Sequence, residues 1–595
     1  MLKEAIHHIN DVPYLFPIGE TEAKVRIRSK RGDVEKAYVL HADRYTPPGS
    51  EKAERLTKVA STEAHDYYEG VLRADTQRIR YAFLLEGRDG ERAWIGENGV
   101  SEDRKLAGYF HCPFIGASWE GAYPTWADDA IVYEIFPERF RNGDAGNDPP
   151  GAEPWDSQAS PTPQSRYGGD LQGIIEKLPY LRELGVNLVY MTPLFRSPSN
   201  HKYNIDDYYE IDPAFGTAED VKRLVDAAHA LGMKVMLDAV FNHSGDGFFA
   251  FRDVMANGEA SPYKDWFFVR DYPVVQRPVP NYATFGSEVT MPKLNCANPE
   301  ARRYMLDFAR HWVERYGIDG WRLDVANEVD HSFWRELRDE IKGIDGELLL
   351  VGEIMHHSAP WLRGDMFDGV MNYPLRDAIV EFFAVQMIGA RAFVGRFESI
   401  RMQYTDRANR CMFNLLGSHD TERFLTACGR SEWGWNEKRE KDRLRLAMAF
   451  LFTYVGMPML YYGDEVGMDG AHDPGCRKPM EWDESRQDVS LREYCQRLIA
   501  LRKEHRALSA GDLRVWFADD AKNTFGYIRY DEDETLGVIL NNSPVAQRLE
   551  LQAPEGFAVL SVQGLFGGTS FSVNERRAII GEVPSYGAAV IQLMP

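Results

Sequence analysis

Residues 320–353 read GWRLDVANEVDHSFWRELRDEIKGIDGELLLVGE, and their pattern decides the fold class. The apolar run Gly320–Val325 predicts a strand, the amphipathic spacing of His331–Lys342 predicts a helix, and the apolar run Leu348–Glu353 predicts a second strand. Two strands joined through a helix are parallel, and a parallel sheet is buried on both faces, which suits runs that are apolar throughout. This stretch is therefore predicted to be one strand–helix–strand unit of a parallel sheet.

The same alternation extends over most of the chain. Six further strands are predicted, at Ala130–Phe136, Val186–Met191, Lys234–Phe241, Asp368–Asn372, Met412–Leu416 and Met459–Gly463. Most are followed by helical patterns, the longest of them at Pro299–Tyr316. Eight such units over about 300–400 residues are typical of an α/β fold of the (β/α)8 barrel type. The irregular stretch 242–298 is too long for an ordinary loop, so we expect a small domain inserted after the third strand.

Both ends of the chain show a different pattern. Short alternating runs such as Lys24–Lys30 near the start and Thr524–Tyr530 near the end are bounded by turns, as in antiparallel sheets with one solvated face. We therefore expect an N-terminal β-sandwich over 1–123, the barrel over 124–506 and a C-terminal β-sandwich over 507–595.

Composition and charge exclude several classes of protein. With 595 residues, 44% hydrophobic and 27% charged, the chain is neither disordered nor collagen-like nor a coiled coil. No run approaches the ~18 apolar residues of a membrane span, and the start MLKEAIHHINDVPYLFPIGE lacks the apolar region of a secretory signal, so we expect a cytoplasmic protein. The net charge of −22 argues against nucleic acid and anionic lipid as partners. It suits a neutral substrate, although ordinary solubility is the favoured reading of charge alone.

The cysteines indicate neither a disulfide scaffold nor a zinc site. None of them forms a CxxC pair or a Cys/His zinc pattern, so reduced thiols in the cytosol are expected. They are Cys112, Cys296, Cys411, Cys428, Cys476 and Cys495.

Acidic side chains follow four of the predicted barrel strands, and strand ends of a barrel meet at one mouth. These acids are Asp238, Asp324, Glu353 and Asp420. Helix capping or pairing with Arg322 explains any single acid as well as a functional role does, but several buried acids in one place are costly. Such a cluster suits glycoside hydrolysis, which needs one protonated acid for the leaving oxygen and one carboxylate at the anomeric carbon.

Four segments resemble the signature regions of the α-amylase family of glycoside hydrolases: DAVFNH at 238–243, GWRLDVANEVDH at 320–331, GEI at 352–354 and LLGSHD at 415–420. MPKLN at 291–295 and DPGCRKPM at 473–480 resemble the neopullulanase, cyclomaltodextrinase and maltogenic amylase subgroup, as does a β domain ahead of the barrel. The resemblance covers essentially the whole chain. It implies a retaining α-glucan hydrolase that acts on cyclodextrins, pullulan and maltodextrins. It also implies cleavage of α-1,4 bonds, with α-1,6 bonds left open, and glycosyl transfer.

Matched position by position, the resemblance implies a role for each site residue. Asp324 would be the nucleophile, Glu353 the general acid/base and Asp420 the acid that stabilises the transition state. Tyr203 would be an aromatic platform for a sugar, and Arg322 would keep Asp324 ionised. The substrate-binding candidates are Tyr203, His243, Phe285, Arg322, Val325, Met355, Tyr373, His419, Asp473 and Arg477.

Two positions depart from the subgroup. Met355 stands where a tryptophan is usual, which leaves open the balance of α-1,4 and α-1,6 cleavage and of hydrolysis and transfer. Gly475 stands where relatives often have an acid.

An oxygen-rich loop follows the first barrel strand. Its candidate ligands are Asn142, Asp144, Asn147, Asp148, Gly168 and Asp170. Composition alone favours a solvated turn, and the spacing is not that of an EF-hand. The run resembles the calcium loop of some subgroup members, however, which implies one structural Ca²⁺ held by hard oxygen ligands.

The resemblance also implies a homodimer, because the N-terminal domain of this subgroup packs over the active site of a partner. Two alternatives are considered. An isomerising or branching relative does not fit the MPKLN segment. A non-catalytic carbohydrate-binding or accessory protein on the same barrel would be expected to lose at least one of the three acids, all of which are present.

Overall fold

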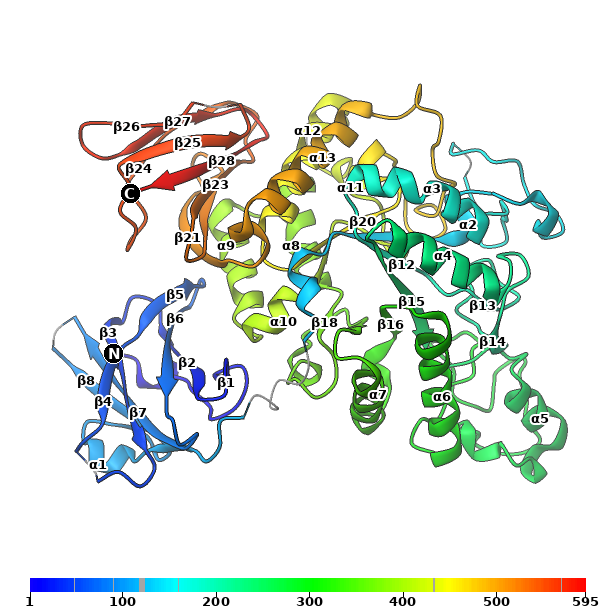
Figure 1. The fold of residues 1–595 in the computed structure, drawn as a ribbon, viewed down its shortest axis with the longest axis horizontal. Helices are drawn as coiled ribbons and strands as arrows, with labels where there is room; N and C mark the ends of the chain where they lie inside the picture. Colours follow the sequence, from blue (N-terminus) through cyan, green and yellow to red (C-terminus); the bar gives the residue numbers. More distant parts are fainter. Residues whose placement is uncertain (48, 89, 117–122, 159, 432–433, 569) are drawn as a thin grey trace.

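Eight parallel strands form the centre of the chain (Figure 1). The computed structural model describes residues 1–47, 49–88, 90–116, 123–158, 160–431, 434–568 and 570–595. The strands are β11 (Val132–Ile135), β12 (Leu188–Met191), β15 (Lys234–Val240), β16 (Gly320–Asp324), β17 (Leu349–Gly352), β18 (Gly369–Val370), β19 (Phe413–Leu415) and β20 (Met457–Tyr461). A parallel bridge between Met371 and Phe413 joins the two outer strands and closes the sheet into a barrel. The predicted fold class is confirmed, although β20 begins at Met457 rather than Met459.

The surrounding helices begin and end at recognisable signals. They include α3 (Leu171–Leu184), α4 (Ala218–Ala230), α6 (Pro299–Tyr316), α7 (His331–Ile344), α9 (Ala390–Arg401), α12 (Glu437–Thr453) and α13 (Val489–Glu504). Thr217 and Asp220 form a capping box at the start of α4. Asn298 caps α6 ahead of Pro299, and the left-handed Gly317 ends it.

The stretch between β15 and α6 forms the predicted insertion. It contains α5 (Phe249–Asn257) and returns to the barrel through an isolated bridge between His243 and Lys293. A second excursion was not predicted. Strands β13 (Phe195–Arg196) and β14 (Asp207–Ile211) form a small hairpin whose connection carries Tyr203.

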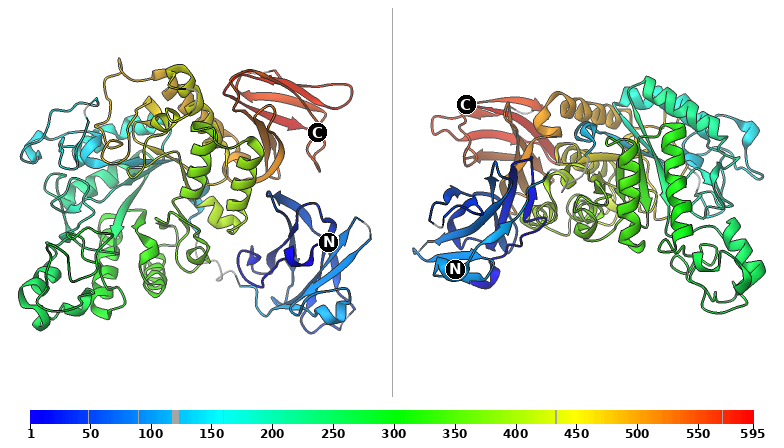
Figure 2. Two further views of the ribbon diagram at one scale, coloured as in Figure 1. Left: turned by 180° about the vertical axis from the view of Figure 1, so that it is seen from behind. Right: turned by 60° about the horizontal axis from the view of Figure 1, so that its bottom comes forward.

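Two β domains precede and follow the barrel in the sequence. The first has a six-stranded sheet facing a four-stranded one, which consists in spatial order of β1 (Leu15–Pro17), β2 (Glu22–Lys30), β6 (His65–Arg73) and β5 (Thr57–Ser61). The second has a five-stranded and a three-stranded sheet. Both views in Figure 2 place them on the same side of the barrel, where α9 contacts β5 (Thr57–Ser61) and β21 (Asp512–Asp519). Residues 117–122, next to the predicted boundary at 123, lie outside the described residues.

Two expectations about the whole chain concern membranes and thiols. Within the described residues, no helix has the length and apolar character that crossing a membrane requires. All six cysteines are free and buried, as expected for reduced thiols.

Candidate active site

A buried arginine holds three carboxyl groups together at the mouth of the barrel. Arg322 Nη1 donates to Asp324 Oδ1 at 2.7 Å and to Asp238 Oδ2 at 2.9 Å. Its Nη2 lies 2.9 Å from Glu353 Oε1. Arg322 and Asp324 are two residues apart on β16 and so point to the same face, while β15 and β17 supply the other acids from either side. The arrangement joins two of the predicted catalytic acids to the guanidinium.

Burial controls the protonation of this cluster. Burial raises the pKa of Asp238 to about 6. It also raises the pKa of Asp324 and of Glu353, while the positive charge of Arg322 acts in the opposite direction. One guanidinium does not neutralise three carboxylates, so the cluster favours holding a proton at mildly acidic to neutral pH. A site with one protonated and one ionised acid has the two forms that glycoside hydrolysis requires.

The backbone after Asp324 fixes the acid on the next strand. Val325 has a φ of 44° and a ψ of 44°, which is left-handed and uncommon for a β-branched residue. The N–H of the same residue donates to Glu353 Oε2, 2.9 Å away. Such a conformation costs on the order of 1–3 kcal/mol, and it is a form of strain found at functional sites.

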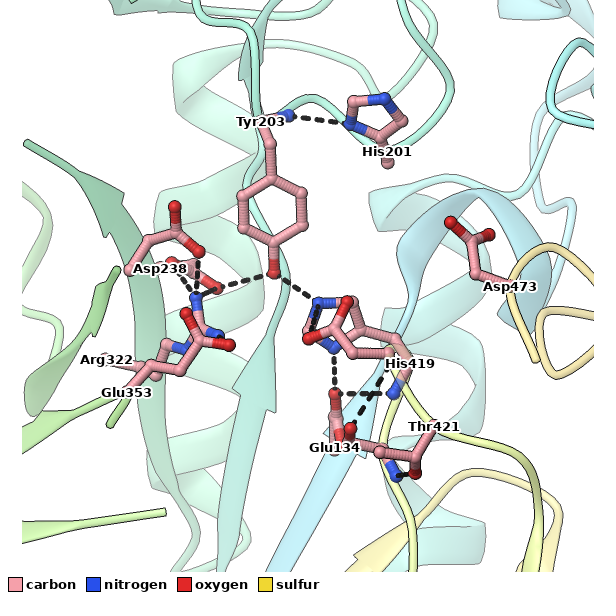
Figure 3. A network of polar contacts seen from close by, with 12 residues as sticks. Glu134, His201, Tyr203, Asp238, Arg322, Glu353, His419, Thr421 and Asp473 are labelled. Atoms are coloured by element: carbon pink, nitrogen blue, oxygen red, sulfur yellow. Dashed lines mark hydrogen bonds and ion pairs between the residues drawn. The ribbon is translucent and has the colours of Figure 1, made fainter. Parts of the chain in front are cut away.

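Tyr203 lies between the two halves of the site. Figure 3 shows its hydroxyl pointing into the space between Asp238 and His419, 3.0 Å from Asp238 Oδ2 and 2.6 Å from His419 Nε2. Its ring is nearly parallel to that of His419, with an angle of 8° between the planes. The Tyr203 hydroxyl is thus hydrogen-bonded on both sides, to Asp238 and to His419. These contacts hold the Tyr203 ring, the predicted sugar platform, in one orientation.

Arg477 connects the third acid to the substrate-binding candidates. Its Nη2 lies 3.2 Å from Asp420 Oδ1, its Nη1 lies 3.0 Å from Asp473 Oδ1, and its Nε donates to the carbonyl oxygen of His419. Asp473 is half exposed, and Figure 3 shows it set back from the Tyr203–His419 contact. The loop 473–480 thus reaches the same mouth as the barrel acids.

The remaining predicted residues also line this region, with different exposure. The rings of His243 and Phe285 stack with their centroids 5.0 Å apart. His243 Nε2 is buried and has no hydrogen-bond partner among the described residues, and burial lowers the pKa of this histidine to about 3, so a neutral ring is left to bind a ligand. The hydroxyl of Tyr373 lies 3.2 Å from Ser418 Oγ. Met355 is 53% exposed.

Several polar residues in the site had no individual role predicted from the sequence. Asp238 was expected in the cluster of acids, but within the segment DAVFNH only His243 was assigned a role. Glu134 is fully buried in β11 and contacts His419, and its signal in the sequence is a charge inside an apolar strand. Lys293 of the insertion donates to Asn242 Oδ1 and to the carbonyl oxygen of Glu328. These contacts join the MPKLN segment of the insertion to the loops that follow β15 and β16.

The oxygen-rich loop brings several of its predicted calcium ligands together. Asn142 and Asp148 are hydrogen-bonded, and a Cβ at Gly168 would lie 2.3 Å from Asp148 Oδ1, so these three residues converge. The Oδ1 atom of Asn147 is buried without a partner in the described structure. Asp170 caps α3 by accepting from Gly173 N at 2.6 Å, and its Oδ2 also accepts from Asp144 N at 2.8 Å and from Asn147 Nδ2 at 3.3 Å, so it contacts the same loop. No group of three or more His, Cys, Asp or Glu suitable for a metal occurs in the described residues, so a cation here would depend on amide and carbonyl oxygens.

Known proteins resemble the chain over its whole length. A family profile described as "Alpha amylase, catalytic domain" matches residues 134–487, and one described as "Alpha amylase, N-terminal ig-like domain" matches residues 1–116. Neopullulanase 2 of Thermoactinomyces vulgaris is 50% identical over 93% of this chain and 94% of its own. The cyclomaltodextrinase of Thermoanaerobacter pseudethanolicus is 44% identical over 93% and 95%. A solved cyclomaltodextrinase structure covers 100% of both chains with a TM-score of 0.93 at 41% identity.

Proposed function

The chain belongs to the α-amylase family and is a glycoside hydrolase of the neopullulanase, cyclomaltodextrinase and maltogenic amylase type, and we propose that it is a retaining enzyme that opens cyclodextrins and cuts pullulan and maltodextrins. The observation that carries this proposal is the contact of Asp324 and Glu353 with the single guanidinium of Arg322. Two carboxyls on one guanidinium favour the close spacing of about 5 Å typical of retaining enzymes over the more than ~6.5 Å of inverting ones.

In the first step, Glu353 donates its proton to the glycosidic oxygen while Asp324 attacks the anomeric carbon. The bond to the leaving oxygen breaks, the shorter glucan departs with a new hydroxyl, and a glycosyl-enzyme ester remains on Asp324. Arg322 stabilises the ionised form of Asp324 before the attack, because its Nη1 donates directly to the attacking carboxylate.

In the second step, the ionised Glu353 removes a proton from water, and the oxygen of that water attacks the anomeric carbon. The ester bond to Asp324 breaks, and Glu353 is protonated again. A sugar hydroxyl in place of water gives transfer instead of hydrolysis, so the acceptor decides the product. Asp420, His243 and His419 would bind sugar hydroxyls near the cleaved bond, with Tyr203 against the apolar face of the ring.

Three further properties are part of the proposal. One Ca²⁺, which would supply charge that ties this loop together and take no part in the reaction, would be held by Asn142, Asp144, Asn147, Asp148, Asp170 and the carbonyl of Gly168. A homodimer is supported by large apolar side chains that the N-terminal domain exposes, among them Tyr45, Leu106 and Phe114. A cytoplasmic location is supported by the six free cysteines.

The test is to incubate the protein and its Asp324→Asn variant with β-cyclodextrin, pullulan and soluble starch and to separate the products. We expect fast opening of the cyclodextrin, panose from pullulan, slow cleavage of starch, and an inactive variant that still binds maltodextrin. Absence of products from the unmodified protein would refute the hydrolase and favour a carbohydrate-binding protein. Panose release with equal activity in the variant would refute the role of Asp324.

A further inference from the structure

The loop that follows Glu353 is held from two sides by the N-terminal β domain of the same chain. This loop, Ile354–Arg363, is here called the Glu353 loop; it contains the exposed Met355 and ends at Arg363 before β18. The acid/base must touch the oxygen that leaves with the acceptor-side sugar, so the segment continuing from it lies beside that sugar. Any contact that holds the loop therefore affects where an acceptor binds.

The first attachment is an ion pair at the end of the loop. Asp11, which lies ahead of β1 (Leu15–Pro17), pairs with Arg363 Nη2. Both side chains are partly exposed, so solvent weakens the pair, and its effect is on the position of the loop more than on stability.

The second attachment passes through Tyr404. Arg26 of β2 (Glu22–Lys30) donates from Nη1 to the carbonyl oxygens of Met402, at 2.8 Å, and Tyr404, at 3.3 Å. The hydroxyl of Tyr404 in turn accepts from the N–H of Ser358, at 3.3 Å, in the middle of the Glu353 loop. The rings of Tyr404 and His357 also stack, with an angle of 22° between their planes.

The N-terminal end of this connection is rigid. Arg26 has no exposed surface, and its Nε donates to Glu69 Oε1 at 2.6 Å. Lys24 on the same strand pairs with Asp406, two residues after Tyr404. Buried, hydrogen-bonded charges of this kind hold one geometry because each alternative leaves a charge unpaired.

We infer that Asp11 and Tyr404 are positioning residues that set the acceptor side of the active site, so that the N-terminal domain of each chain tunes its own balance between hydrolysis and transfer. The inference rests on the proposed function. The proposed function does not include this effect, which arises within one chain. The N-terminal domain influences acceptor binding without contacting the reacting atoms.

The experiment uses α-maltosyl fluoride as donor and glucose as acceptor, with Asp11→Asn, Tyr404→Phe and the double variant. α-Maltosyl fluoride has no sugar on the acceptor side, so the release of fluoride ion at low glucose reports formation of the glycosyl-enzyme. The rate of this release in the variants should stay within about twofold of the parent. The glucose concentration that half-saturates transfer should rise about threefold or more in the double variant, which corresponds to a loss of about 0.65 kcal/mol or more. Glu22→Gln, which removes the exposed ion pair with Arg73 inside the N-terminal domain, is the matched control and should change neither value.

Three results separate the possibilities. An unchanged half-saturating glucose concentration in a folded double variant overturns the inference. Equal losses of fluoride release and of transfer also overturn it, because they indicate general damage. Absence of fluoride release from the unmodified protein refutes the proposed function itself. Tyr404→Phe keeps the aromatic ring, so this variant tests the hydroxyl contact even where the double variant folds poorly.

Discussion

The side chains of Glu134 and His419 lie 2.5 Å apart, from Oε1 to Nδ1, although 285 positions separate them in the chain. Both are buried, which raises the pKa of Glu134 and lowers the pKa of His419 to about 4. This buried hydrogen bond fixes the orientation of the His419 ring. The contact turns the other ring nitrogen, Nε2, toward Tyr203 and to within 3.2 Å of Asp420 Oδ2.

Replacement of Glu134 by glutamine should impair catalysis through His419. The amide keeps the shape but loses the charge-assisted hydrogen bond, so we expect kcat/KM for β-cyclodextrin to fall roughly 10- to 100-fold. Steady-state kinetics measure the effect. Glu465→Gln is the matched control, because Glu465 is also fully buried but accepts from Tyr133 and Tyr180. Equal losses in both variants would contradict a specific role for Glu134.

The pH dependence should identify the general acid. Glu353 must be protonated to donate, and burial raises its pKa, so kcat/KM for cyclodextrin should fall as the pH rises through a value above the usual glutamate range. Glu353→Gln should lose on the order of 100- to 10,000-fold on cyclodextrin and lose this alkaline limb. With α-maltosyl fluoride, whose leaving group needs little protonation, the first step should be largely retained. An alkaline limb that persists in Glu353→Gln would assign it to another group.

Met355 offers a test of acceptor binding. A tryptophan in its place would present a large flat surface to a sugar, worth about 0.5–1.5 kcal/mol. Met355→Trp should therefore lower the half-saturating concentration of a glucose acceptor about two- to tenfold and raise the share of transfer products. Met387→Trp, at a surface position that is 73% exposed, is the control. No change in product ratio would show that position 355 does not contact the acceptor.

The oxygen-rich loop predicts a calcium-dependent melting temperature. Calcium at about 100 times its Kd should add ~2.7 kcal/mol to the free energy of unfolding, which a thermal melt with and without chelator detects. Asp148→Ala should abolish the shift, whereas Asp156→Ala, at an exposed site of the same region, should keep it. If millimolar calcium does not change the melting temperature of the unmodified protein, this loop does not bind the ion.

The eight barrel strands could be predicted because each is a short apolar run and most are followed by a helical pattern, and Asp324 and Glu353 lie at the ends of such runs. The hairpin β13–β14 could not be predicted, since β13 has only two residues. It is a strand because it pairs with β14, and its own sequence has no strand pattern. Glu134 was missed for a related reason. Its partner, His419, is brought close only by barrel closure, and no spacing along the chain encodes that contact.

The seam of the barrel has a consequence for how the enzyme fails on heating. Strand β18 has two residues, and on one side it is attached to its neighbour by the Met371–Phe413 bridge and by two hydrogen bonds of Asn372, from N to Phe413 O and from Nδ2 to Asn414 Oδ1. Gly369 permits this approach, because a Cβ there would lie 1.9 Å from the carbonyl oxygen of Cys411. The seam stands between the strands that lead to Glu353 and to Asp420. Separation of β18 from β19 would move these two acids apart while the helices stay folded. Thermal inactivation should therefore precede the loss of secondary structure, and the amide hydrogens of 369–372 should exchange first.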